Sequence, residues 1–140
     1  MKYWDSSAII PLIVHEAVSE RQESLLHDDP EIVTWWASKI EITSALNRLY
    51  REGALDSSDI RRAFLDVETL ASAWLEIQAT EKLRNRAIRL LRVHPLRAAN
   101  AIQLSASLIA AEENPLTLPF VCNDTRLAEA AEKEGFIVLP

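Results

Sequence analysis

The sequence of 140 residues contains only two glycines and one cysteine, and it has no long hydrophobic run. With so few glycines it has little means of building the glycine-rich loops that hold phosphates, and neither a P-loop nor a dinucleotide-binding fingerprint is found. The lone Cys122 cannot form an internal disulfide, and the Cys/His spacings of zinc fingers are absent. The apolar run 8–14 is interrupted by Pro11 and is too short to cross a bilayer. These absences predict a cytoplasmic protein with no membrane role.

The composition is that of one folded domain, which we expect to cover residues 1–140. Apolar residues make up 49% of the chain and charged residues 26%, both close to the averages for globular proteins. The net charge of −6 argues against a surface that coats nucleic acid generally, because such binding neutralises phosphates with Lys and Arg.

One basic segment breaks this acidic pattern. Residues 82–97 contain six Lys and Arg residues and no acidic residue. On a helix, Lys82, Arg86 and Arg89 share one face by their i, i+4, i+7 spacing and form a stripe able to follow a phosphate backbone. With Arg97 they are the predicted RNA contacts. The alternative is a solvated helix face whose charge offsets carboxylates elsewhere.

The hydrophobic pattern alternates between short strands and longer helices. Strands are expected at 2–5, 31–34, 75–79, 118–122 and 136–139. Helices are expected between them, with Ser6 or Ser7 capping the first, Gly53 and Gly135 ending two others, and Pro95 opening the one after the basic segment. Such alternation predicts a doubly wound α/β domain with right-handed crossovers between parallel strands.

Four oxygen-bearing side chains occur where this architecture would bring them to one edge of the sheet. Asp5 ends the first strand and Asp124 follows the fourth, while Glu41 and Asn100 occur near the starts of helices. Ligands of open α/β sheets bind beyond the carboxyl ends of the strands. If the first and fourth strands are neighbours, both aspartates project into the same crevice.

Such a cluster predicts a cation. Like charges about 4 Å apart repel by roughly 4 kcal/mol at an effective dielectric of 20, so three unpaired carboxylates require compensation. Mg²⁺ prefers oxygen ligands and is commonly held by one or two carboxylates together with substrate phosphate; we expect Mn²⁺ to substitute for it. A metal held there would activate water to hydrolyse a phosphodiester without a nucleophilic side chain. Asp5, Glu41 and Asp124 are the predicted catalytic and metal-binding residues, and Asn100 is the fourth predicted ligand.

Four motifs resemble those of PIN-domain proteins of the VapC-like toxin group. They are Asp5-Ser6-Ser7-Ala8, Glu41-Ile42-Thr43-Ser44-Ala45-Leu46, His94-Pro95-Leu96-Arg97-Ala98-Ala99-Asn100-Ala101-Ile102 and Phe120-Val121-Cys122-Asn123-Asp124-Thr125-Arg126-Leu127. Their order and spacing cover essentially the whole chain. The sequence departs from the family at two positions, with Asn100 where a third acidic ligand is usual and Cys122 where a threonine is common.

The resemblance implies a three-layer α/β/α sandwich around a mostly parallel sheet of about five strands. It implies a metal-dependent endoribonuclease that is the toxin of a toxin–antitoxin pair, with a cognate antitoxin and a homodimer as partners. Ser6 and Ser7 are expected to support the metal ligands by hydrogen bonds. Because the Asn100 amide is neutral, the site loses one negative charge and some cation affinity. Two alternatives stay open, namely a catalytically silent PIN-fold module that binds antitoxin or RNA, and an RNA-processing nuclease without an antitoxin.

The adjacent pair Trp35 and Trp36 must point to opposite sides if both lie on a strand, so only one can face the core. The other is a candidate for contact with antitoxin or RNA.

Overall fold

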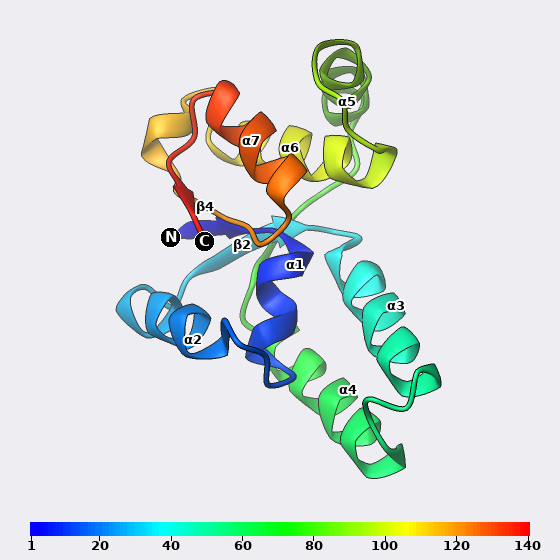
Figure 1. The fold of residues 1–140 in the computed structure, drawn as a ribbon. Coiled ribbons are helices and arrows are strands. Elements are labelled where there is room, and N and C mark those ends of the chain that lie inside the picture. Colours follow the sequence, from blue (N-terminus) through cyan, green and yellow to red (C-terminus); the bar gives the residue numbers. More distant parts are fainter.

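A five-stranded sheet in the order β3-β2-β1-β4-β5 forms the centre of the computed structural model, which describes residues 1–140 (Figure 1). All four neighbouring strand pairs are parallel. The strands are β1 (Lys2–Trp4), β2 (Ile32–Trp35), β3 (Leu75–Ile77), β4 (Phe120–Val121) and β5 (Val138–Leu139). This sheet confirms the predicted α/β fold.

Helices cover both faces of the sheet and complete three layers. They are α1 (Ser6–Ile9), α2 (Ser19–Asp28), α3 (Ser38–Arg51), α4 (Ser57–Ala71), α5 (Glu81–Val93), α6 (Ala98–Ala110) and α7 (Thr125–Lys133), with short 3₁₀ turns η1 (Ile10–Leu12) and η2 (Pro115–Thr117). In Figure 1, α5, α6 and α7 lie on one side of the sheet and α1 to α4 on the other. None of these helices has the length and apolar character needed to cross a bilayer.

Alternation along the central strand produces two hydrophobic cores. Tyr3 packs in one core with Phe120 and Leu104, and its ring stacks on Phe120 at a centroid distance of 5.3 Å. Trp4, the next residue, packs in the other core with Ile42. Successive strand side chains point to opposite faces, so β1 joins both helical layers to the sheet.

The tryptophan pair follows the same rule. Trp35 is buried, whereas Trp36 is 49% exposed, and their rings meet edge to face at 6.2 Å. The prediction that only one of them faces the core is confirmed.

Two predicted helix starts are wrong. Asp5, not Ser6 or Ser7, caps α1, because its carboxylate accepts the Ser7 backbone N–H at 3.0 Å. Pro95 does not open α6, which begins at Ala98. The Leu96 N–H bonds to the His94 carbonyl at 2.9 Å, so the chain forms a tight turn around Pro95 before it becomes helical.

Several predicted elements are longer than those observed. The expected strands 118–122 and 136–139 pair over only two residues each, at Phe120–Val121 and Val138–Leu139. Helix α6 ends at Ala110, and Pro115 begins η2. The predicted glycine ends hold, since Gly53 and Gly135 have φ values of +80° and +99° that suit glycine.

Candidate metal centre

The strand order brings the two aspartates to one edge of the sheet. β1 and β4 are neighbours, with Trp4 opposite Val121, and the Asp5 N–H continues the pairing by donating to the Val121 carbonyl at 3.1 Å. Asp124 follows β4 and caps α7. The neighbouring strands required by the sequence argument are therefore present, and both carboxylates lie beyond the carboxyl ends of their strands.

Asp5 is the most buried acidic side chain of this edge, being only 3% exposed. Its pKa is raised to about 6: burial is the largest cause, the nearby negative charges of Glu41 and Asp124 add to the rise, and the hydrogen bonds from Ser7 oppose it. Both the backbone N–H and the hydroxyl of Ser7 donate to the same carboxylate oxygen. The charged form of Asp5 is thus held in place but poorly compensated.

Glu41 lies in the first turn of α3 and is held by two neutral donors. The Ser6 hydroxyl donates to its Oε2 at 2.6 Å, and the Gln103 amide nitrogen lies 3.3 Å from each carboxylate oxygen. Burial raises the pKa of Glu41, and these hydrogen bonds partly offset that shift. Each serine therefore bonds a different carboxylate, Ser7 that of Asp5 and Ser6 that of Glu41.

Asn100 lies in the first turn of α6 and contacts Asp124. Its Nδ2 donates to Asp124 Oδ2 at 3.2 Å, while Asp124 Oδ1 accepts the Leu127 backbone N–H at 3.0 Å. Asn100 and Gln103 form no hydrogen bond with each other, since each amide has other partners. Rotating the Asn100 amide would present its oxygen where the amino group now lies.

None of the three carboxylates has a cationic partner. No Lys, Arg, His or N-terminal nitrogen forms an ion pair with Asp5, Glu41 or Asp124. Their donors are hydroxyl, amide and backbone groups, which orient a carboxylate without cancelling its charge. Carboxylate oxygens whose charge is not cancelled by a cationic side chain are suitable ligands for a hard divalent cation.

The side chains do not yet surround a common point. No three His, Cys, Asp or Glu side chains converge in the geometry of a metal site. Each carboxylate is bonded to its own donors, Asp5 to Ser7, Glu41 to Ser6 and Gln103, and Asp124 to the Leu127 N–H and Asn100.

Two other groups near the motifs do not extend the ligand set. Cys122 Sγ lies 3.8 Å from Asp5 Oδ2, and burial raises the pKa of its thiol, so it remains protonated and a poor ligand. His94 Nε2 lies 2.6 Å from a carboxylate oxygen of Glu134, a pair that joins the ends of α5 and α7. His94 therefore lies outside the cluster, in the link between these two helix ends.

The basic residues of α5 divide into paired and unpaired groups. The Arg86 guanidinium lies 2.8 Å from the Glu113 carboxylate, so its charge is already compensated within the chain. Lys82, Arg89 and Arg97 are exposed and form no ion pair. Arg97 is the N-cap residue of α6, three residues before Asn100. Of the four predicted RNA contacts, Arg86 is the least available.

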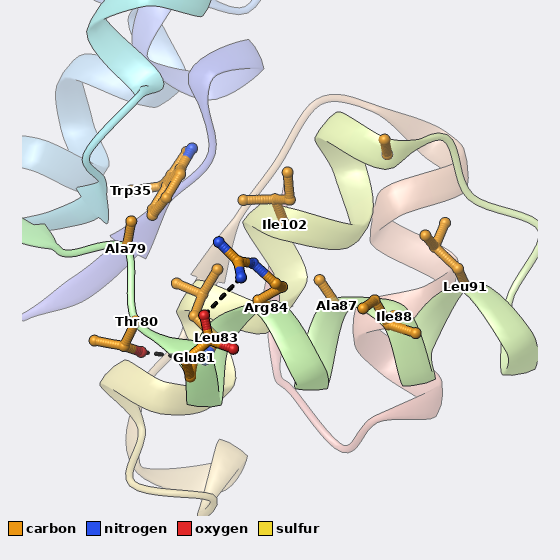
Figure 2. A pocket seen from close by; sticks show the side chains of 11 residues that line it. Trp35, Ala79, Thr80, Glu81, Leu83, Arg84, Ala87, Ile88, Leu91 and Ile102 are labelled. Carbon is orange, nitrogen blue, oxygen red and sulfur yellow. Dashed lines mark hydrogen bonds and ion pairs between the residues drawn. The ribbon is translucent and has the colours of Figure 1, made fainter.

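A hollow of about 460 Å³ lies among Trp35 of β2, the side chains of α5, and Ala98 and Ile102 of α6 (Figure 2). Its lining is mostly apolar, with Trp35 and Ile102 facing the α5 side chains Ile88 and Leu91. Its two charged lining residues are paired with each other, as Arg84 Nη1 lies 2.6 Å from Glu81 Oε1. This hollow therefore offers no free carboxylates for a metal.

Three buried polar residues next to the cluster were not predicted from the sequence to belong to the site: Tyr3, Ser38 and Gln103. Gln103 is bonded to Tyr3, to Ser38 and to Glu41, so it connects the other two residues to the cluster. A glutamine followed by two serines within the otherwise apolar stretch of α6 was the available signal, because buried polar side chains need partners.

Comparison with known proteins supports this reading of the fold and the motifs. No protein-family model matches the chain. It is 26% identical over 138 residues to Ribonuclease VapC45 and to Ribonuclease VapC49, from two strains of Mycobacterium tuberculosis, and the alignment covers 99% of this chain and 94% of each relative.

Two solved structures share the fold over the whole chain. One is FitAcB from Neisseria gonorrhoeae, with a TM-score of 0.69, and the other is a toxin–antitoxin complex from Klebsiella pneumoniae, with a TM-score of 0.64. Each is 14% identical in sequence, and the match covers 100% of this chain and 97% of the other.

The raised pKa of Asp5 predicts that Asp5→Asn stabilises the metal-free protein at neutral pH. Between about pH 4 and 6 the folded state retains a proton that the unfolded chain has released, so stability falls as pH rises through that range. Above pH 6 the ionised carboxylate destabilises the fold by on the order of 3 kcal/mol. Asparagine keeps the helix cap without the charge.

Thermal unfolding in EDTA at pH 4 and pH 7.5 checks this. We expect Asp5→Asn to exceed the wild type in melting temperature at pH 7.5 and to match it at pH 4, whereas the exposed Asp66→Asn on α4 should change neither. A lower melting temperature for Asp5→Asn at pH 7.5 would contradict the assigned burial of an uncompensated charge.

Proposed function

From the premise that this chain is related to VapC-family PIN-domain ribonucleases, we propose that it is a metal-dependent endoribonuclease and the toxin of a toxin–antitoxin pair. The substrate is RNA, and the reaction is hydrolysis of a phosphodiester bond. The sequence relatives are named as ribonucleases, and the structural neighbour from Klebsiella pneumoniae is a toxin–antitoxin complex.

One observation carries the proposal: three carboxylates from separate parts of the chain lie at one edge of the sheet without any cationic side chain. Asp5 and Glu41 are close enough to raise the pKa of Asp5 by repulsion, and Asp124 adds to it. A structural role for such a cluster would need ion pairs, because buried charges without partners are costly. A function that recruits a cation accounts for the cluster.

We assign Asp5, Glu41 and Asp124 as the ligands of Mg²⁺, with the Asn100 amide oxygen as a fourth and Mn²⁺ able to substitute. When bound, the metal supplies activation of the attacking water and neutralises charge that develops on the phosphoryl oxygens. The chain's own residues orient the carboxylates: Ser7 holds Asp5, Ser6 holds Glu41, and the Leu127 N–H holds Asp124.

The exposed cations supply the contact to the RNA backbone. Arg97 stands at the N-terminus of α6, beside Asn100, and Lys82 lies in the first turn of α5. Neither side chain is engaged in an ion pair, so each is free to neutralise a phosphate.

The proposed protein partners are a cognate antitoxin and a second copy of the chain. Exposed apolar side chains near the cluster, Trp36 and Ile40 at the start of α3, suit contact with protein better than contact with water. An RNA-processing nuclease without an antitoxin is the alternative. Co-expression with the product of a neighbouring small gene separates the two, because an antitoxin would relieve growth arrest and bind the purified chain.

The neutral Asn100 keeps a second candidate function open, a silent module that retains the fold without cleaving RNA. The specific observation in its favour is that the Asn100 amide donates to Asp124 and so satisfies a carboxylate that a metal would otherwise neutralise.

Asn100→Asp separates the nuclease from the silent module. The substitution replaces the Asn100 amide, which donates to Asp124, by a fourth negatively charged carboxylate. We expect Mn²⁺ affinity to rise about tenfold, which corresponds to about 1.4 kcal/mol of binding free energy. Cleavage of single-stranded RNA in Mg²⁺ should rise with it, measured on a labelled oligonucleotide under single-turnover conditions. Tighter metal binding with no cleavage by either protein would favour the silent module.

Removing the unpaired cations should weaken RNA binding. We expect Lys82→Ala and Arg97→Ala each to lower affinity for a non-cleaved single-stranded RNA, and the double variant to reduce the slope of log K against log salt by about 1.4, since each phosphate contact contributes about 0.7. Fluorescence anisotropy at several salt concentrations measures this. Arg84→Ala is the matched control, because its charge is paired with Glu81; an equal loss for the control would refute the assigned surface.

A further inference from the structure

Gln103 is fully buried on α6 and joins three elements through its side-chain amide. Its Oε1 accepts the Tyr3 hydroxyl from β1 at 2.6 Å. Its Nε2 lies 3.0 Å from Ser38 Oγ and 3.3 Å from both carboxylate oxygens of Glu41, all on α3. Every polar atom of this side chain therefore has a partner, and one of those partners is a proposed metal ligand.

The chemistry of its neighbours fixes which way the Gln103 amide points. The Tyr3 phenol is an O–H donor, and it lies 2.6 Å from Gln103 Oε1, which can only accept. A carboxylate can only accept. Rotating the amide by half a turn would set its oxygen against the negative charge of Glu41 and leave the Tyr3 proton facing an amino group.

The remaining hydroxyls continue the same network into the sheet. Thr34 Oγ1 lies 2.7 Å from both the Trp4 carbonyl oxygen and Ser38 Oγ. The carbonyl can only accept, so the Thr34 proton goes there and the Ser38 proton remains for the Ser38–Thr34 contact. Ser38 is thus left to accept from Gln103, and the whole buried network has one consistent arrangement of protons.

A neutral donor has a different consequence for Glu41 than an arginine or lysine would have. The Gln103 amide and the Ser6 hydroxyl restrict where the carboxylate points but leave its charge uncancelled. A cationic side chain at the same place would compete with a metal ion for that charge. Gln103 is also one helical turn from Asn100, so a single helix contacts both Glu41 and Asp124.

We propose that Gln103, oriented by the Tyr3 hydroxyl, is a positioning residue that sets the Glu41 carboxylate for a divalent cation. This inference rests on the proposed function, because it assigns a role toward the metal that Asp5, Glu41 and Asp124 would hold. It predicts that Tyr3, which touches none of the three carboxylates by hydrogen bond, acts on metal affinity only through Gln103.

Calorimetric titration of Mn²⁺ into the full chain tests this without relying on RNA cleavage. Gln103→Met keeps the length of the side chain without its donor, and we expect about tenfold weaker Mn²⁺ binding. Tyr3→Phe keeps the ring that stacks on Phe120 and should weaken binding severalfold. In the double variant, Tyr3→Phe should cause no further loss beyond that of Gln103→Met.

Ser105→Ala is the matched structural control. It also removes a buried hydrogen bond of α6, from Ser105 Oγ to the Leu83 carbonyl at 2.7 Å, but on the side away from Glu41. We expect it to lower the melting temperature measured in EDTA while leaving Mn²⁺ affinity unchanged. If Gln103→Met does not fold, Tyr3→Phe measured against Ser105→Ala decides the question alone.

The outcomes separate this inference from the function on which it rests. Unchanged Mn²⁺ affinity in Tyr3→Phe and Gln103→Met, with binding abolished in Asp5→Ala, would overturn the positioning role and leave the metal site standing. Wild-type protein that binds no Mn²⁺, or binding that survives Asp5→Ala, would overturn the metal site and the positioning role together. Equal effects of Tyr3→Phe in the presence and absence of Gln103 would also refute action through Gln103.

Discussion

The burial of carboxylates that have no cationic partner, to which their mutual repulsion adds, is the constraint on which the proposed site depends. Asp5 is buried beside Glu41 and Asp124, and its only stabilising partners are neutral hydrogen-bond donors. The fold tolerates this arrangement because the surrounding cores are apolar and well packed on both faces of the sheet. A group of residues that lowers stability in the absence of a ligand is typical of a functional site and unusual for residues with a purely structural role.

The parallel topology explains why residues so distant in sequence meet. With β1 at the centre of the order β3-β2-β1-β4-β5, the chain leaves β1 and β4 at the same edge, and the helices that follow begin there. Asp5 and Asp124 both cap those helices, so each carboxylate is oriented by backbone N–H groups as well as by side chains. Glu41 and Asn100 come from the first turns of α3 and α6. Two of the four proposed ligands are therefore also helix caps.

Much of this arrangement could be predicted from the sequence, because periodicity, capping residues and glycine positions are local signals. The alternation of strands and helices and the exposure of one tryptophan were confirmed, and the adjacency of the first and fourth strands, on which the shared crevice was conditional, is present. The Pro95 helix start was wrong because a proline suits both a first helical turn and a tight turn, and only the position of buried His94 decides between them. Gln103 was missed as a partner of Glu41, since no local pattern reports a contact between residues 62 positions apart. The ion pair between Arg86 and Glu113 could likewise not be predicted from helical spacing, because Glu113 lies outside the helix that carries Arg86.

The most direct test of the central claim is the anomalous scattering of a crystal grown with Mn²⁺. We expect one strong peak of anomalous difference density surrounded by carboxylate oxygens of Asp5, Glu41 and Asp124. The Asn100 amide should be turned so that its oxygen faces the ion. A peak at another surface, or no peak with the three carboxylates in the same hydrogen bonds as in the metal-free protein, would contradict this assignment.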